Sequence, residues 1–215
     1  MNCHSCGSRN LYISLLDSRL HGNDRIIRAT RRVAPTYSTH SIFGRMTELS
    51  IMSEDAADWY RKGINLGKLG RLAEALDAYN EALKLNPLYI DAWYNKGVIL
   101  GKLERHEEAI RAYEEVIRLK PDMPEAWCNK GNRLVYLNRQ NESLEFFVQA
   151  TKLKPDYAHA WYNAACIYAF RSENQIALAA LHKALNLDIK YKPEARTDKY
   201  FKNLQDDEDF RNIVS

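Results

Sequence analysis

The stretch that decides the fold is residues 56–89, AADWYRKGINLGKLGRLAEALDAYNEALKLNPLY, followed by residues 90–123, IDAWYNKGVILGKLERHEEAIRAYEEVIRLKPDM. The two stretches align without a gap over 34 positions, with tryptophan, glycine, leucine, alanine and proline in the same slots. Residues 124–157 and 158–191 keep most of these slots. A fixed period of this length indicates tandem structural units that stack on one another.

Within one unit the spacings predict two helices. Trp59, Gly63 and Leu66 stand at i, i+4 and i+7, which places them on one stripe of a first helix. Ala75 and Tyr79 begin a matching stripe on a second helix. A proline closes each of the first three units, and it disfavours helical geometry in the residue before it. One hairpin cannot bury its apolar stripe alone, so the units must stack to form a continuous core.

The recurring slots define a predicted core. We expect the small residues to let the two helices approach closely, while the aromatic residues fill the space between hairpins. The predicted repeat core comprises Trp59, Gly63, Ala75, Tyr79, Trp93, Gly97, Ala109, Tyr113, Trp127, Gly131, Phe147, Trp161 and Ala165.

The pattern Trp59-x3-Gly63-x2-Leu66 with Ala75-x3-Tyr79, repeated every 34 residues, resembles the tetratricopeptide-repeat (TPR) family. The resemblance covers roughly residues 56–191. It implies an all-α fold: a right-handed α-solenoid of four helix-turn-helix hairpins. We therefore expect an N-terminal extension at 1–52, repeats within 53–191 (56–89, 90–123, 124–157 and 158–191), and a C-terminal segment at 192–215.

Residues 192–215 depart from the repeat pattern. The fourth unit has Ile189 where the others have proline, and Phe201 and Phe210 stand among scattered apolar residues. Acidic residues precede Phe210 and favour the start of a short helix. We predict a helical cap over the last hairpin; a regulatory acidic tail is the alternative.

The resemblance also implies that one side of the first helices lines a concave groove for an extended segment of another protein. Three units carry asparagine two residues after tryptophan, and an asparagine side chain can both donate to and accept from a peptide backbone. The alternative is that these asparagines bond to the neighbouring helix. Likewise, His159 either contacts a ligand or lies on the solvated surface. The predicted groove residues are Tyr60, Arg61, Tyr94, Asn95, Asn129, Asn132, His159, Tyr162 and Asn163.

The chaperone-binding class of this family clamps a terminal carboxylate with basic side chains and asparagine. The matching slots hold Tyr60, Ile64, Asn95, Glu125 and Asn129. Glu125 would repel a carboxylate. We predict that this chain does not recognise the acidic tails of chaperones.

Residues 1–50 differ in composition from the rest. They contain seven arginines, three acids and no lysine. Cys3-His4-Ser5-Cys6 has the spacing of a zinc ribbon, but a second ligand pair at similar spacing is missing, so we expect no metal site. The Arg- and Ser-rich composition also resembles a transit peptide. We expect instead a disordered extension, or a mis-assigned start ahead of Met46 or Met52.

The charge balance argues against a nucleic-acid-binding surface. The net charge of +3 divides into +4 for residues 1–50 (7 − 3) and −1 for residues 51–215 (24 − 25). A near-neutral repeat region lacks the broad cationic face that nucleic acids require. The longest apolar run is too short to cross a membrane, and no signal-peptide pattern occurs.

The sequence contains no catalytic constellation or phosphate-binding loop at motif spacing. We therefore expect a cytoplasmic protein-interaction adaptor that is not an enzyme and has no cofactor. The alternative is a regulatory or substrate-positioning subunit of an enzyme complex. Only a co-purified partner separates the two, and the sequence indicates neither the partner nor the oligomeric state.

Overall fold

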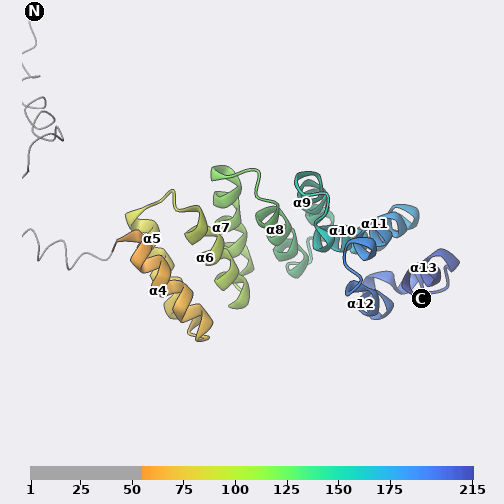
Figure 1. Cartoon of the computed structure of the whole chain (residues 1–215), viewed down its shortest axis with the longest axis horizontal. Helices are drawn as coiled ribbons and strands as arrows, with labels where there is room; N and C mark the ends of the chain where they lie inside the picture. Colours follow the sequence, from red (N-terminus) through yellow and green to blue (C-terminus); the bar gives the residue numbers. More distant parts are fainter. Residues whose placement is uncertain (1–54) are drawn as a thin grey trace, which may run out of the picture. The chain divides into compact units, whose positions relative to one another are not determined.

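A computed structural model describes residues 55–215, in which all regular structure is helical. Figure 1 shows these residues as helical hairpins that follow one another along the chain. The hairpins of the described part are α4 (Ala56–Lys68) with α5 (Leu72–Leu85), α6 (Ile90–Lys102) with α7 (His106–Leu119), α8 (Pro124–Tyr136) with α9 (Gln140–Leu153), and α10 (Ala158–Phe170) with α11 (Asn174–Leu187). The predicted solenoid of four hairpins is confirmed. The expected N-terminal extension and its two cysteines lie outside the described residues.

Local sequence signals mark the starts of α4 and α8. The Asp55 carboxylate accepts from the Asp58 backbone N–H at 2.8 Å, and the Asp58 carboxylate accepts from the Asp55 backbone N–H at 3.3 Å. This reciprocal capping box satisfies two backbone donors at the start of α4. Pro124 occupies the first position of α8, where its missing N–H costs nothing.

The turn inside each hairpin contains one residue with a positive φ angle. Gly70 has φ of 76°, and the residues at the same slot of the later units, Glu104, Asn138 and Ser172, have φ of 59°, 58° and 61°. Only glycine adopts this left-handed conformation without cost, and asparagine tolerates it. The hairpin turn requires the left-handed conformation at this slot. Two of the four turns, those with Glu104 and Ser172, therefore place an unfavourable residue type there.

The glycine slot of the first helix is explained by an aromatic ring from the second helix of the same hairpin. A Cβ atom on Gly63 would lie 2.6 Å from the ring of Tyr79. The corresponding distance is 2.7 Å for Gly97 against Tyr113, and 2.7 Å for Gly131 against Phe147. Contacts this short would force the ring to move, so the glycine is required by the ring. Ala75 and Ala109 of the predicted core are fully buried.

The tryptophans join consecutive hairpins. Each indole is half-buried, and the Nε1–H groups of Trp93, Trp127 and Trp161 donate to the carbonyls of the preceding prolines. The distances to Pro87, Pro121 and Pro155 are 2.9, 2.8 and 3.0 Å respectively. Each of these prolines therefore follows the end of a second helix. Its carbonyl also accepts a hydrogen bond from the tryptophan on the first helix of the next unit.

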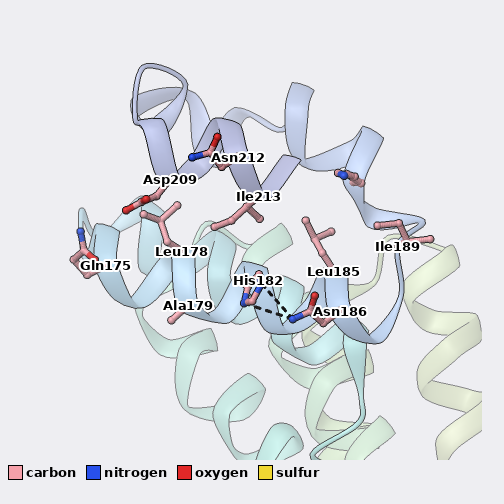
Figure 2. A pocket seen from close by; sticks show the side chains of 11 residues that line it. Gln175, Leu178, Ala179, His182, Leu185, Asn186, Ile189, Asp209, Asn212 and Ile213 are labelled. Atoms are coloured by element: carbon pink, nitrogen blue, oxygen red, sulfur yellow. Dashed lines mark hydrogen bonds between the residues drawn. The ribbon is translucent and has the colours of Figure 1, made fainter. Parts of the chain in front are cut away.

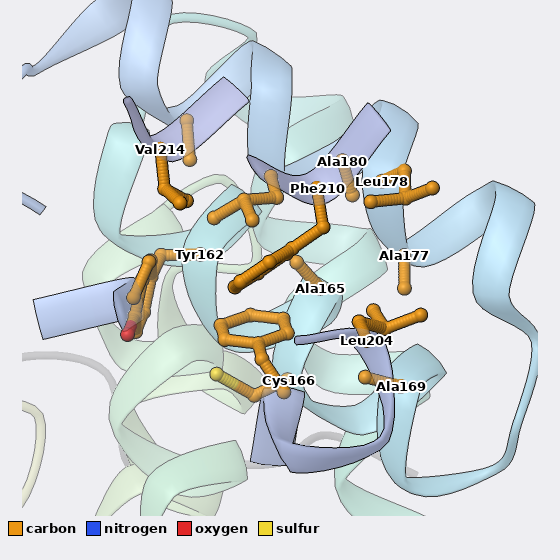
Figure 3. Packing of buried hydrophobic residues seen from close by; sticks show 14 of the residues in the cluster. Tyr162, Ala165, Cys166, Ala169, Ala177, Leu178, Ala180, Leu204, Phe210 and Val214 are labelled. Carbon is orange, nitrogen blue, oxygen red and sulfur yellow. The ribbon is translucent and has the colours of Figure 1, made fainter. Parts of the chain in front are cut away.

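The segment after α11 folds over the last hairpin. It contains α12 (Tyr191–Thr197), the 3-10 helix η2 (Lys199–Leu204) and α13 (Glu208–Val214). Phe201 and Phe210 are fully buried against α10 and α11, in the cluster shown in Figure 3. The Asp207 carboxylate caps α13 by accepting from the Phe210 backbone N–H at 3.2 Å. At least one member of the acidic run therefore has a structural function at a helix start.

Candidate functional site

One side of the first helices α4, α6, α8 and α10 carries the predicted groove residues; we call this side the first-helix face. The Asn95 side-chain amide donates to the Tyr60 hydroxyl at 3.0 Å, and the Asn129 amide donates to the Tyr94 hydroxyl at 3.0 Å. Each bond joins residues 35 positions apart and links the first helices of consecutive units. The alternative interpretation, in which the asparagines bond to the neighbouring helix, therefore holds for one of the two N–H groups of each side-chain amide.

These pairs leave hydrogen-bonding groups unused. Tyr60 and Tyr94 are half-buried, and burial raises the pKa of both phenols, so both hydroxyls keep their proton at neutral pH. The Oδ1 atoms of Asn95 and Asn129 accept no hydrogen bond from any residue in the described range. Each pair can therefore offer an O–H donor, an amide N–H donor and an amide oxygen acceptor.

The third link of the series differs because Cys128 replaces the tyrosine. The Asn163 amide lies 3.7 Å from the Cys128 sulfur, and it also donates to Asn132 Oδ1 at 2.9 Å. Cys128 is fully buried, and this burial raises the pKa of its thiol to about 12. The thiol is therefore protonated at neutral pH and is not a nucleophile.

His159 lies at the centre of a polar cluster on the same face. Its Nε2 atom is 3.1 Å from the Asn163 amide nitrogen and 3.3 Å from that of Asn132, while its Nδ1 atom is 3.1 Å from the Tyr191 hydroxyl. Burial, and secondarily Lys190, lowers the pKa of His159, which favours the neutral imidazole. Because the two amides donate to Nε2, the ring proton belongs on Nδ1. The interpretation of His159 as a solvated surface residue is therefore wrong.

Tyr162 is only 3 % exposed, unlike the tyrosines of the first two units. The ring of Tyr191 stacks on the ring of Tyr162 with centroids 4.9 Å apart. The Tyr162 hydroxyl donates to the Asp198 carboxylate at 3.0 Å. A ligand on the first-helix face cannot reach the Tyr162 ring in this arrangement, because the cap covers it. Sequence reasoning missed Tyr191 here, although Tyr191 occupies the same repeat slot as Tyr89 and Tyr157.

Two charged residues of the first-helix face, Arg61 and Glu125, each have an ion-pair partner. Arg61 is exposed and forms an ion pair with Asp58 on the same helix. Glu125, at the slot where a carboxylate clamp needs a basic or amide group, lies 3.6 Å from the Lys154 ammonium and stays partly exposed. The face therefore presents a carboxylate at this point.

The described residues 55–215 contain neither a candidate metal site nor a membrane-spanning helix. In that range, His, Cys, Asp and Glu side chains form no group of three or more that could hold a metal ion. None of the helices in the same range has the length and apolar character needed to cross a membrane.

Stacked helical hairpins with a recurring 34-residue unit define the class of helical-repeat proteins. The chain belongs to the tetratricopeptide-repeat family: one model of this family matches residues 60–124, and a second matches residues 124–157. This family and fold indicate a protein-interaction function. No curated protein matches the chain.

Solved structures of the same fold share little sequence with this chain. YrrB, described as a TPR protein with an unusual peptide-binding site, is 19 % identical, with 78 % of this chain and 87 % of YrrB covered and a TM-score of 0.64. MamA from Desulfovibrio magneticus RS-1 is 23 % identical, with 63 % and 77 % covered and a TM-score of 0.59. The first TPR of Spaghetti (RPAP3), bound to the HSP90 peptide SRMEEVD, is 19 % identical, with 55 % and 94 % covered and a TM-score of 0.53.

Proposed function

We propose that this protein is a cytoplasmic adaptor that binds an extended segment of another protein along the first-helix face. The observation that carries the proposal is the pair of equivalent Asn–Tyr links, Asn95 to Tyr60 and Asn129 to Tyr94, both of 3.0 Å. Each link holds the asparagine in one orientation and leaves its amide oxygen uncommitted within the described chain. Similar polar groups thus recur from one unit to the next.

This arrangement suits a peptide backbone better than a particular side chain. An extended chain presents one N–H and one C=O per residue, and an asparagine amide complements both. Helices pack about 8–10 Å apart, and an extended chain advances about 3.3 Å per residue, so consecutive links would engage the backbone about every three residues. We propose Tyr60, Arg61, Tyr94, Asn95, Asn129, Asn132, His159 and Asn163 as the ligand-facing set.

The proposal does not extend to a chaperone tail. The Glu125 side chain stands at the clamp slot, lies 3.6 Å from the Lys154 ammonium and is partly exposed. We therefore keep the prediction that acidic chaperone tails are not bound. Tight binding of a peptide such as SRMEEVD to the purified chain would contradict it.

The test is a selection of peptides from a random displayed library on the wild-type chain, followed by affinity measurements on variants. The triple variant Asn95→Ala, Asn129→Ala, Asn163→Ala loses three charge-neutral hydrogen-bonding groups worth about 1 kcal/mol each, so we expect about a hundredfold weaker binding. A control with Asn65→Ala and Asn80→Ala, outside the predicted set, should bind like the wild type. Equal binding by the triple variant would remove this proposal.

A further inference from the structure

Two tyrosines form an aromatic pair at the start of the first-helix face. The ring of Tyr60, on α4, and the ring of Tyr89, at the N-cap of α6, have centroids 4.8 Å apart and planes inclined at 39°. Both side chains are half-buried, so part of each ring stays open to solvent. Tyr89 lies outside the set of groove residues predicted from the sequence. The pair gives the face an aromatic surface next to the Asn95–Tyr60 link.

A carboxylate without a partner lies beside this pair. Asp91 and Asn95 stand four positions apart on α6, so their side chains share one side of the helix, and Asn95 reaches Tyr60 from that side. Burial, and secondarily the Asp91 carboxylate, raises the pKa of both the Tyr60 and the Tyr89 phenols, as a nearby negative charge does. The Asp91 side chain is exposed and forms no hydrogen bond or ion pair with any residue in the range 55–215.

Negative charge exceeds positive charge around the pair. Besides burial and Asp91, two further charges act on the pKa of Tyr89: Asp55 raises it and Arg61 lowers it. Arg61 already forms an ion pair with Asp58 on the same helix. Three carboxylates therefore stand here with one guanidinium, and Asp91 is the carboxylate that has no bonding partner within the described residues.

The later units change this combination step by step. At the slot of Asp91 the third unit has Glu125, which lies 3.6 Å from Lys154, and Met123 replaces the second tyrosine of the pair. The fourth unit has His159 at the same slot, with its pKa lowered by burial. Among the described units, an open aromatic pair and an unpaired carboxylate therefore occur together at the junction of the first and second.

The hollow at the other end of the described chain has no such open surface. It lies between α11 and α13 and is shown in Figure 2. Ile213 of the cap packs over its apolar floor, which consists of Leu178 and Leu185, and each leucine is only 5 % exposed. The cap itself thus occupies the apolar surface at that end.

We propose that Tyr60, Tyr89 and Asp91 form a site, here called the Asp91 site, that takes an arginine side chain of the bound segment. The inference rests on the proposed function and adds one side-chain preference to it. A guanidinium is planar and always charged, and it can stack on an aromatic ring while it bonds to a carboxylate. The excess of negative charge attracts a basic segment and repels an acidic one, which agrees with the expected rejection of chaperone tails.

Asp91 also has a local function that the test must separate from binding. It lies in the first turn of α6, where an acidic residue favours the start of a helix. This local function contributes to the stability of the chain. It gives no preference for one bound peptide over another, so the composition and affinity of bound peptides are the readouts that matter.

The experiment repeats the selection from the random displayed library on three forms of the full chain: wild type, Asp91→Asn and Asp77→Asn. Asp77→Asn removes the same charge from an exposed position on α5, outside the first-helix face, and is the matched control. Peptides selected on the wild type and on the control should contain arginine about fivefold more often than the unselected library, the gain expected from a cation–π contact. Selection on Asp91→Asn should lose most of this enrichment.

A double-mutant cycle on one selected peptide locates the contact. Asp91→Asn should weaken its binding about tenfold, and so should replacement of the arginine in the peptide by glutamine. The two changes together should cost little more than either alone, because both remove the same contact. Tyr89→Leu, which keeps apolar bulk but removes the ring, should weaken the arginine peptide more than the glutamine peptide. Urea denaturation of each variant measures the effect on stability separately.

Two outcomes would overturn this inference and leave the proposed function intact. One is a set of peptides that depend on the three asparagines of the triple variant but show no arginine enrichment. The other is equal enrichment or equal affinity for the arginine peptide on Asp91→Asn and the wild type, which would place the arginine elsewhere. A library that yields no binder to the wild type would remove the proposed function and this inference together.

Discussion

The first three hairpins and the fourth reach the same packing with different side chains. In the former, a glycine on the first helix lies under an aromatic ring of the second, as with Gly97 and Tyr113. In the fourth, Ala165 and Leu181 occupy these slots, and both are fully buried in one cluster. A larger residue on the first helix is accompanied by a smaller one on the second. The hairpin therefore requires complementary volumes rather than a fixed residue at either slot.

The same two regions differ in what they leave accessible. Tyr60 and Tyr94 in the first two units are half-buried, whereas Tyr162 in the fourth is 3 % exposed under Tyr191. The cap thus closes the first-helix face at the fourth unit, and the accessible Asn–Tyr links belong to the first three. Substitutions can test two points. The first is whether the fourth hairpin depends on its cap. The second is whether its different core results from volume exchange, that is, from a larger residue on the first helix matched by a smaller one on the second.

The largest effect is expected from Phe201→Ala. Phe201 is fully buried between the cap and the last hairpin, so its removal should lower the free energy of unfolding by about 3–5 kcal/mol. Urea denaturation would measure the loss, and hydrogen exchange should show α10 and α11 losing protection before α4 to α7. Phe170→Ala, at a site that is 50 % exposed, is the control and should cost far less. Equal loss of protection in all hairpins would contradict a cap that acts on the fourth.

A smaller effect is expected from Gly97→Ala. The new Cβ would lie 2.7 Å from the Tyr113 ring, and overpacking of this kind costs about 1–3 kcal/mol. Adding Tyr113→Leu recreates the Ala–Leu pair of the fourth hairpin and should restore part of that stability. Thermal unfolding of the two single variants and the double variant would give the coupling energy, which we expect to be favourable by about 1 kcal/mol. Additive effects of the two changes would argue against volume exchange.

The smallest effect is expected at the turn slot. Ser172 has φ of 61°, so Ser172→Gly should relieve left-handed strain and stabilise the chain by about 0.5 kcal/mol after the entropy of glycine is counted. Gly70→Ala, at φ of 76°, should destabilise the first hairpin by about 1 kcal/mol. Both are measured by chemical denaturation, with Asn138→Gly as a near-neutral control because asparagine tolerates this conformation. Stabilisation by Gly70→Ala would contradict the argument.

The fold could be predicted because tryptophan, glycine and proline recur at a fixed interval, and each has a mechanical reason to do so. The candidate site could be predicted only in part. The Asn95–Tyr60 bond spans 35 residues, one more than the repeat, so comparison of equivalent slots does not reveal it. The covering of Tyr162 depends on Tyr191 and Asp198. Tyr191 occupies a repeat slot, but in the fourth unit it begins α12, and Asp198 lies beyond the last repeat. Irregular segments have no internal copy to align with, and their contacts follow only from the folded structure.

The indole-to-proline bonds give this chain an internal optical reporter. Trp93, Trp127 and Trp161 each sit at one junction between units and bond across it, while Trp59 lies on the first helix. Because indole emission responds to its surroundings, variants that keep a single tryptophan would report on one junction at a time. The order in which the solenoid separates, from either end or from its middle, can therefore be followed by fluorescence without an added label.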